Sequence, residues 1–348
     1  MKDINRRQKS GAILIAMLWI VVILTILAVS LGQAARTEIA LTQRAAGKLK
    51  AKYYAFAGLT YAIEQIRLDS LDPASNQEDT LYYCGILKNS NHSSEDLFHE
   101  KPIGDGYFSI GNPTGSGFED EERRLNINAL SVQNSNVFIA LLELLSVNTE
   151  SAEEIVFSML DWKDSDDVLA DSIYGAENDY YLSLSRPYRC KDSSFDSLEE
   201  LLLVRGMTPE IFTKIAPYLT IFPKQGFLAV NFNTASQEVL CALARGVVGS
   251  MTNTNLADAD SLVAKILDYR RGEDGVELSA DDRSVDVNDL SLNANERAIL
   301  LTLNQYRTLK SDYFRVNTQG VAGFNKVKVN LEAIIERASA SIVALRAD

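Results

Sequence analysis

The chain has 348 residues, more than one domain usually contains, so we expect two or three structural units. Its formal net charge is -13 at pH 7, and such an acidic surface repels phosphate backbones, which argues against nucleic acid as a partner. The only histidines, His92 and His99, lie in a polar stretch, and the sequence has no glycine-rich phosphate loop, so we expect no enzyme.

The N-terminus combines a short basic leader with a long apolar run. The leader contains Lys2, Arg6, Arg7 and Lys9 against one acid, and the apolar run extends from Gly11 to Leu31. Such a run is long enough to cross a bilayer core, since spanning takes about 20 apolar residues. Because basic residues stay on the cytoplasmic side, the rest of the chain is expected on the far side of the membrane. A plain N-terminal anchor or an uncleaved secretory signal fits these features as well.

The position of one glycine and the pattern after the apolar run narrow this interpretation. Gly11 stands before the apolar run, whereas a secretory signal places small residues after it. Beyond the run, apolar residues recur at steps of three and four without a proline before Pro73. We therefore predict one continuous helix from Ala12 to about Arg67. Its apolar positions are Leu49, Tyr53, Phe56, Leu59, Ile63 and Ile66.

This combination resembles the N-terminal spine of type IV pilins and type II secretion pseudopilins. The resemblance implies that a dedicated prepilin peptidase cuts between Gly11 and Ala12 and methylates the new N-terminus. Residues 1–11 would then be the leader and 12–68 the spine. Most members of these families have Glu at the fifth mature position, where this chain has Ala16. A subunit without that carboxylate lacks the contact to a neighbour's N-terminal amine, which suits a place at the end of a fibre.

The remaining sequence indicates a sheet interrupted by helices. Residues 69–125 predict short strands and turns, and residues 306–348 predict further strands that complete a small antiparallel sheet. The charged run from Glu119 to Arg124 is expected to be a solvated turn. Residues 126–305 predict an all-α insertion between the two halves of the sheet. The expected fold class is therefore α+β, with a pilin-like long N-terminal helix, a small antiparallel sheet and a large helical insertion.

The insertion contains an internal repeat. The segment from Asn126 to Asp161 and the segment from Asn231 to Asp268 share one plan, in which an Asn-rich start leads into two apolar helices. Between them, one helix is predicted to end at Gly206, and Thr208 is predicted to cap the next. These elements resemble helix-hairpin-helix, or SAM-like, modules, which many DNA-binding proteins use. Because acids replace the expected lysines, a packing or partner-docking role is favoured.

One acidic loop suggests a metal site. Asp164, Asp166, Asp171, Glu177 and Asp179 offer hard oxygen ligands of the kind that Ca²⁺ requires. Their spacing does not match an EF-hand, which needs glycine at the sixth loop position and Glu at the twelfth. The alternative is a polar loop whose acids cap helices and turns.

Three cysteines, Cys84, Cys190 and Cys241, would face an oxidising compartment in a periplasmic ectodomain. Three cysteines allow one disulfide and one remaining thiol, and the sequence leaves the pairing open.

Taken together, the spine, the acidic loop, Pro187-Tyr188, Ser197–Gly206 and Asn231–Ala235 resemble the protein K family of minor pseudopilins. Members of that family have been seen with calcium. The resemblance implies a non-catalytic subunit of the inner membrane with a periplasmic ectodomain, which caps the pseudopilus, initiates its assembly and aids protein export. Its expected partners are the other minor pseudopilins, the major pseudopilin, the prepilin peptidase, and secreted cargo or the secretin. A minor type IV pilin and an uncleaved membrane-anchored binding protein are the competing interpretations.

Overall fold

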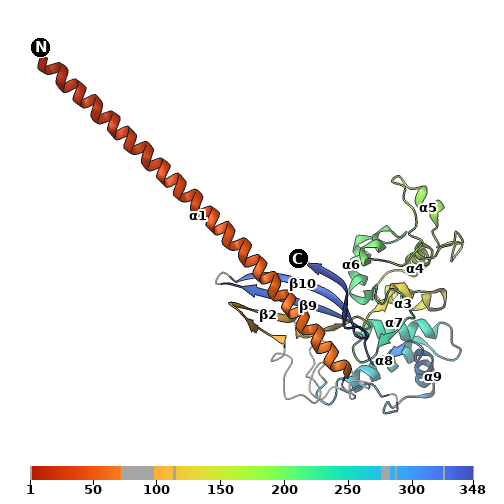
Figure 1. Ribbon diagram of the computed structural model, residues 1–348. Helices are drawn as coiled ribbons and strands as arrows, with labels where there is room; N and C mark the ends of the chain where they lie inside the picture. Colours follow the sequence, from red (N-terminus) through yellow and green to blue (C-terminus); the bar gives the residue numbers. More distant parts are fainter. Residues whose placement is uncertain are drawn as a thin grey trace.

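The computed structural model describes residues 2–71, 98–112, 115–275, 283–286, 288–323 and 326–347. It confirms the expected α+β architecture, with a long N-terminal helix, a small antiparallel sheet and a helical unit beside the sheet (Figure 1). The strands expected within 81–97, His92 and Cys84 lie outside the described residues.

A single helix, α1 (Lys2–Leu71), forms the spine, four residues longer at its C-terminal end than the sequence pattern predicts. Its N-terminal half stands free of the rest of the molecule, and its C-terminal part lies on the sheet (Figure 1). Small residues on the sheet side allow close contact, because a Cβ on Gly320 would lie 2.0 Å from the carbonyl oxygen of Ala51. A glycine is therefore required where the sheet meets the spine. The buried face of α1 consists of Ala51, Ala55, Leu59, Ala62 and Ile66.

The main sheet is antiparallel and joins two distant parts of the chain. Its strand order is β1 (Lys101–Ile103), β2 (Gly106–Asn112), β9 (Tyr313–Ala322), β10 (Val327–Glu336) and β11 (Ser341–Ala347). Two short strands, β3 (Gly115–Ser116) and β4 (Glu119–Asp120), pair with β2 and β9. Alternate residues of β9, such as Phe314 and Val316, are fully buried and belong to one apolar cluster with Leu59 of α1. The long central strands therefore attach the C-terminal part of the chain to the spine.

The helical unit lies between β4 and β9 in the sequence and has its own apolar core. Thr208 caps α6 as predicted, since its hydroxyl accepts a hydrogen bond from the Ile211 N–H. The helices are α3 (Ser135–Leu144), α4 (Thr149–Lys163), α5 (Asn178–Leu182), α6 (Pro209–Ile215), α7 (Gln237–Val248), α8 (Leu256–Arg270) and α9 (Ala294–Leu303). The 3-10 turns are η2 (Ile127–Ala129), η3 (Val132–Asn134), η4 (Leu198–Leu203) and η5 (Ala216–Tyr218).

The two copies of the internal repeat make equivalent contacts. In the first copy, Asn128 accepts a hydrogen bond from the Phe195 N–H, and Lys163 at the end of α4 donates to the Asn128 carbonyl. In the second copy, Asn233 accepts from the Val285 N–H, and Arg270 at the end of α8 donates to the neighbouring Phe232 carbonyl. Each copy also begins with a two-residue parallel bridge. These are β5 (Leu125–Asn126) with β6 (Leu219–Thr220), and β7 (Val230–Asn231) with β8 (Arg307–Thr308).

The copies pack against each other through α3 and α7. A Cβ on Gly246 of α7 would lie 2.6 Å from the Cα of Val137 in α3, so the helix backbones touch at this point. In a DNA-binding hairpin, such a glycine would offer its backbone to phosphate. Here Gly246 is buried against a neighbouring helix, which favours the packing role.

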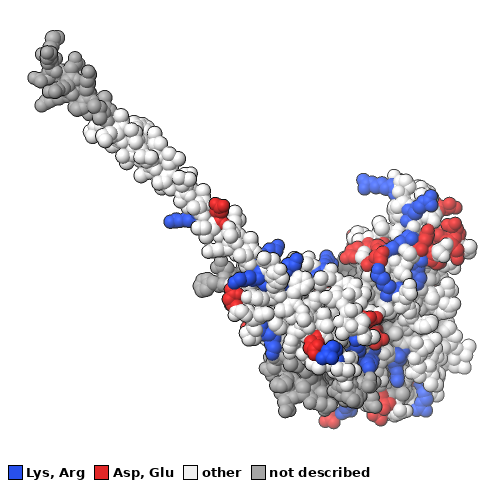
Figure 2. Space-filling model, viewed as in Figure 1, with Lys and Arg blue, Asp and Glu red and all other residues white. Residues whose placement is uncertain are grey.

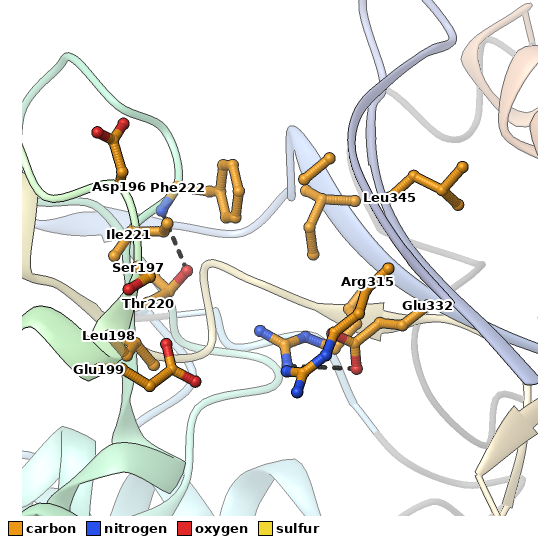
Figure 3. Close-up of a pocket in the computed structure, with 13 residues that line it drawn as sticks. Asp196, Ser197, Leu198, Glu199, Thr220, Ile221, Phe222, Arg315, Glu332 and Leu345 are labelled. Atoms are coloured by element: carbon orange, nitrogen blue, oxygen red, sulfur yellow. Dashed lines mark hydrogen bonds and ion pairs between the residues drawn. The ribbon is translucent and has the colours of Figure 1, made fainter. Parts of the chain in front are cut away.

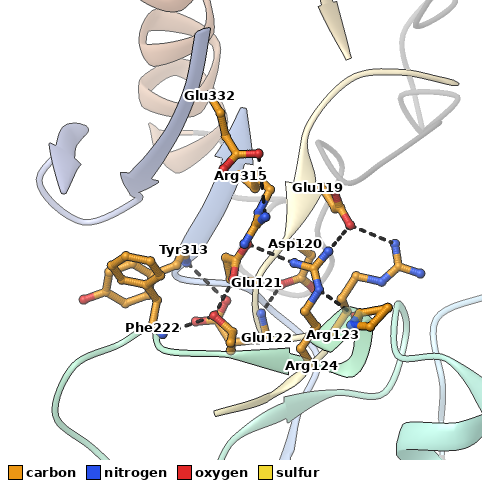
Figure 4. Close-up of polar contacts among 12 residues, drawn as sticks. Glu119, Asp120, Glu121, Glu122, Arg123, Arg124, Phe222, Tyr313, Arg315 and Glu332 are labelled. Atoms are coloured by element: carbon orange, nitrogen blue, oxygen red, sulfur yellow. Dashed lines mark hydrogen bonds and ion pairs between the residues drawn. The ribbon is translucent and has the colours of Figure 1, made fainter. Parts of the chain in front are cut away.

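The expectation of a solvated turn at Glu119–Arg124 is wrong, because Asp120, Glu121 and Glu122 are buried. Figure 4 shows these acids between β9 and the helical unit. Glu121 accepts hydrogen bonds from the Arg315 Nε at 2.6 Å and from the Arg124 Nη1 at 2.9 Å. Burial raises the pKa of Glu121, but the charges of these two arginines more than offset the effect, and its pKa lies below the ordinary value.

The other two acids join the same boundary through neutral and backbone donors. Asp120 accepts from the Asn231 Nδ2 at 2.9 Å and from the Thr234 hydroxyl at 2.5 Å. Glu122 accepts from the Asp312 and Tyr313 N–H groups of the chain entering β9. Burial, and then the charge of Asp120, raise the pKa of Glu122 well above its usual range. We call Asp120, Glu121 and Glu122 the acidic lock, because they fasten the helical unit to the sheet.

The acidic lock predicts unequal effects of two matched substitutions. Glu121→Gln should lower the free energy of unfolding by about 3 kcal/mol at neutral pH, since it leaves two part-buried arginines without their anionic partner. Glu122→Gln should cost far less, because it also removes a poorly solvated charge. Wild-type protein should gain stability as pH falls from the raised pKa of Glu122 toward 4.5, and Glu122→Gln should lose this gain. Urea unfolding of the soluble ectodomain at pH 4.5 to 8 measures both. Equal losses of unfolding free energy in the two variants would contradict the different roles assigned to Glu121 and Glu122.

Candidate functional site

The candidate site is built on the C-terminal turn of α4. Asp161 lies in that turn and is fully buried. Its two carboxylate oxygens accept hydrogen bonds from the Ala170 N–H at 2.7 Å and from the Ala176 N–H at 2.6 Å, so the following loop folds back onto the helix end. A Cβ on Gly175 would lie 2.4 Å from the Asp161 Oδ2, and no larger residue fits here without movement. The local fold thus holds a carboxylate in an enclosed position.

Two further carboxylates converge on Asp161. One oxygen each of Asp161, Asp164 and Glu177 lies within 4.8 Å of the others. The Glu177 side chain is only 6 % exposed, and neither of its carboxylate oxygens has a hydrogen-bond donor among the residues that the structure describes. The same holds for the Asp164 Oδ1. Burial, and then the negative charges of Asp161 and Asp164, raise the pKa of Glu177 to about 7.

These unpaired buried oxygens indicate what the cluster can bind. A buried polar atom without a partner is costly, and three adjacent carboxylates repel one another. A divalent cation would give the unpaired oxygens a partner and offset the repulsion between the carboxylates. Carboxylate oxygens are the ligands that Ca²⁺ prefers. The residues present therefore fit a calcium ion, with Asp161, Asp164 and Glu177 as its carboxylate ligands. Figure 2 shows further Asp and Glu side chains over this α4–α5 end of the molecule.

The structure divides the five acids that the sequence suggested as ligands. Asp164 and Glu177 meet in the cluster. Asp166 accepts from the Val168 N–H and Asp171 from the Ile173 N–H, so both acids close turns of the loop. Asp179 is exposed in the first turn of α5. The alternative interpretation, acids that cap turns, thus describes Asp166 and Asp171.

Asp161 completes the cluster and was not among those five acids. It precedes Asp164 by three residues, which places the two side chains on one side of a helix turn. That spacing is the signal that could have identified it. Behind the cluster, Trp162 packs edge-on against Tyr181, and the buried Cys190 thiol lies 3.8 Å from the Ala176 carbonyl oxygen. Burial raises the pKa of Cys190 to about 12, and among the described cysteines neither it nor Cys241 forms a disulfide.

The second candidate region is the outer part of the spine. Leu14–Leu71 contains an 18-residue window with a mean hydropathy of 2.9, none of which is buried, so the helix qualifies by length and composition as a membrane span. Figure 2 shows that the described outer part of this helix carries no charged residues. Ala16 is exposed within it. Gly11 and Ala12 continue the helical backbone, and their side chains lie outside the described residues.

The fold and these two regions define a class of protein. An apolar spine helix packed on a small antiparallel sheet is the architecture of pilin-like subunits, here with a helical unit inserted between strands of the sheet. A solved structure of the GspK-GspI-GspJ complex from the enterotoxigenic Escherichia coli type 2 secretion system contains a chain with this fold. The similarity has a TM-score of 0.61 at 18 % identity and covers 90 % of this chain and 99 % of that chain.

Sequence comparisons show similarity to one family. A family model described as type II secretion system protein K matches residues 123–224, which begin directly after the acidic lock and extend past β6. The type II secretion system protein K of Aeromonas hydrophila is 38 % identical over 101 residues, which are 29 % of this chain and 30 % of that relative. The protein K of Pectobacterium carotovorum is 27 % identical, over 66 % of this chain and 68 % of its own length. That of Pseudomonas aeruginosa is also 27 % identical, over 68 % of this chain and 69 % of its own length. These comparisons show that the chain is similar to type II secretion system protein K, through residues 123–224 in the family model and through about two thirds of its length in the longer matches.

Proposed function

We propose that this chain is a non-catalytic minor pseudopilin that caps the tip of a type II secretion pseudopilus. In this role it is anchored in the inner membrane by α1, its ectodomain lies in the periplasm, and it initiates fibre assembly and aids protein export. Similarity to type II secretion system protein K supports the secretion role. The observation that carries the position at the tip is Ala16, which stands in the exposed apolar spine where most related subunits have a carboxylate.

The absence of that carboxylate restricts how the subunit can assemble. A carboxylate within lipid is stable only when it is paired, and the neighbour's N-terminal amine supplies the partner in related fibres. A subunit with alanine at this position offers its own amine but has no carboxylate for the amine of another subunit. One side of the spine therefore lacks a bonding partner, as expected for a terminal subunit.

The shape of the ectodomain supports the same position. The helical unit spreads to one side of the sheet, away from the line of α1 (Figure 1). Repeating this bulk along a tightly wound fibre would bring it against neighbouring subunits, whereas the tip has room above it. Smaller minor pseudopilins would bind from below through their own spines. The helical unit would then meet secreted cargo or the outer-membrane secretin.

The position at the tip predicts about one copy per fibre. Gold labelling of the ectodomain on sheared fibres should mark one end, and quantitative mass spectrometry should give far fewer copies than of the major pseudopilin. Ala16→Glu should leave membrane insertion unchanged and let the protein enter the fibre body or stall assembly. Ala28→Glu, deeper in the apolar run, serves as a control for the general cost of a carboxylate in the spine. Labelling along the whole fibre would exclude the cap.

Processing distinguishes this function from an uncleaved anchored binding protein. We expect the prepilin peptidase to cut between Gly11 and Ala12, so that the intact mature protein has lost 11 residues and carries a methylated N-terminus. Gly11→Val should block the cut, because a branched side chain replaces the hydrogen of glycine at the cleavage position. Intact-mass measurement on membranes with and without the peptidase gives the result. A chain that still begins at Met1 in peptidase-competent cells would refute the proposal. A genetic neighbourhood without a secretion ATPase and secretin would instead favour a minor type IV pilin.

We also propose that the carboxylate cluster binds Ca²⁺ and that the ion fixes the loop between α4 and α5. Three buried or half-buried carboxylates meet there, and both Glu177 oxygens and the Asp164 Oδ1 lack donors among the described residues, which supports this assignment. The ion would supply the positive charge that the cluster lacks. Asp161 would hold both the ion and the two loop N–H groups, so that binding stiffens the loop from its base.

Calcium should therefore raise the melting temperature of the ectodomain, because an ion that binds only the folded state stabilises it by about 2.7 kcal/mol at 100 times its dissociation constant. Glu177→Gln should abolish this rise. In chelator, the same variant should be more stable than wild type above pH 7 and lose the advantage toward pH 4.5, since the wild-type side chain is then protonated in the folded state. Asp179→Asn is the matched control in the same loop. A melting temperature indifferent to calcium would show that the cluster is only a polar loop.

A further inference from the structure

The two edges of the main sheet differ in how they are protected. The β1 edge is three residues long and contains Pro102. Its turn into β2 is fastened to the spine, because Asp105 binds the Lys50 ammonium at 2.9 Å and the Tyr54 hydroxyl at 2.5 Å. Short strands, prolines and covering side chains are the usual means by which proteins block pairing at a sheet edge. This edge is therefore closed.

The opposite edge, β11, lacks these features. It has seven residues and contains no proline, and only β10 pairs with it among the strands that the structure describes. In an antiparallel ladder about half of the N–H and C=O groups of an edge strand point outward, where they can pair with another strand. Three branched apolar side chains of β11 are also exposed, with Ile342 at 40 %, Val343 at 44 % and Leu345 at 47 %. Exposed apolar edges of this kind mark pairing sites.

Register places the two faces of β11 in different surroundings. Leu345 lies opposite Ala333, which is buried in the cluster under α1, so Leu345 projects on the spine side of the sheet. Arg346 lies opposite Glu332 and projects on the other side, where it lines a cleft between the sheet and the helical unit. Arg346 forms no ion pair within the described part of the chain.

The cleft beside β11 has a volume of about 240 Å³, and both apolar and charged residues line it. Figure 3 shows Ile221 and Phe222 of the helical unit on one side and Arg315 with Glu332 of the sheet on the other. Ile334 and Ala344 of the sheet complete the apolar lining. An unpaired strand edge next to a side-chain pocket is the arrangement used in strand addition, where the backbone supplies affinity and the pocket supplies specificity.

We propose that β11 and this cleft bind an edge strand of a neighbouring minor pseudopilin, which extends the sheet by one strand. The strand would place one apolar side chain in the cleft and a carboxylate against Arg346. This inference rests on the proposed function and specifies the partner surface within it.

The surroundings of β11 favour such a subunit over a second copy of this chain. Two copies paired antiparallel through β11, about an axis perpendicular to the sheet, would point their spines in opposite directions and could not share one membrane. A row of copies would have to join β11 to the closed β1 edge. A different subunit, anchored by its own spine beside α1, would bring its sheet alongside Leu345 and meet neither obstacle.

The test uses the full ectodomain and, as probes, the soluble ectodomains of the other minor pseudopilins from the same secretion system. Hydrogen exchange of the β11 amides that point outward should slow in the complex, whereas amides that already pair with β10 should change little. Leu345→Lys, which places a charge on the edge, should weaken the complex by about tenfold or more. Leu301→Lys on α9 replaces a leucine that is 66 % exposed and is the matched control, expected to change affinity by less than about twofold. Arg346→Glu should weaken binding at low salt more than at high salt.

The outcomes separate this inference from the proposed function. If the complex forms and neither β11 exchange nor Leu345→Lys affects it, the partner strand does not bind here, and the proposed function stands. If the wild-type ectodomain binds none of the probes, both fail. A concentration-dependent dimer of this chain that Leu345→Lys disrupts would assign the edge to a second copy and overturn the inference. Melting temperatures of the variants equal to wild type show that the fold is intact.

Discussion

The structure depends on the acidic lock, because a helical unit inserted between strands must be held at both of its ends. Glu121 is the central residue of this attachment. It binds Arg315 of β9 and Arg124 next to β5, and its second oxygen accepts from the Thr220 hydroxyl of β6. Sheet, insertion and the bridge between them thus share one carboxylate. Buried ion pairs contribute little net stability compared with apolar packing, but they are costly to break, so they define a single arrangement of the two units.

Within the insertion, equivalent polar contacts hold each copy of the internal repeat together. Near the start of each copy, an asparagine side chain accepts a hydrogen bond from a backbone N–H of a distant loop. A cation at the end of the second helix of each copy donates hydrogen bonds to the carbonyl oxygens around that start. Lys163 and Arg270 have this role in the two copies. Cations are also favoured at helix C-termini by the helix dipole. The copies differ after this point, since only the first continues into the loop with the carboxylate cluster.

The features that the sequence predicted are those with a local physical signal. The spine follows from apolar periodicity, the α6 cap from Thr208 and Pro209, and the repeat from its recurring asparagines. The acidic lock was misread because a run of acids followed by two arginines is typical of a solvated turn, while most of its partners lie about 100 to 190 residues away along the chain. Of the five acids suggested as ligands, two lie in the carboxylate cluster. Asp164 and Glu177 were named, but Asp161 could be distinguished from Asp166 only by the folding back of the loop, which depends on the Ala170 and Ala176 N–H groups.

The acidic lock and the cleft beside β11 are physically linked, because Arg315 and Thr220 donate hydrogen bonds to Glu121 and also line the cleft. Arg315 also lies 3.7 Å from Glu332 of β10, so one guanidinium connects the lock to the strand that pairs with β11. The two walls of the cleft are therefore held at a fixed separation by buried charges and not by a flexible linker. A partner strand that entered the cleft would meet a preformed surface and would lose little free energy in ordering it. The same contacts that orient the helical unit on the sheet thus determine the shape that this surface offers to a neighbouring subunit.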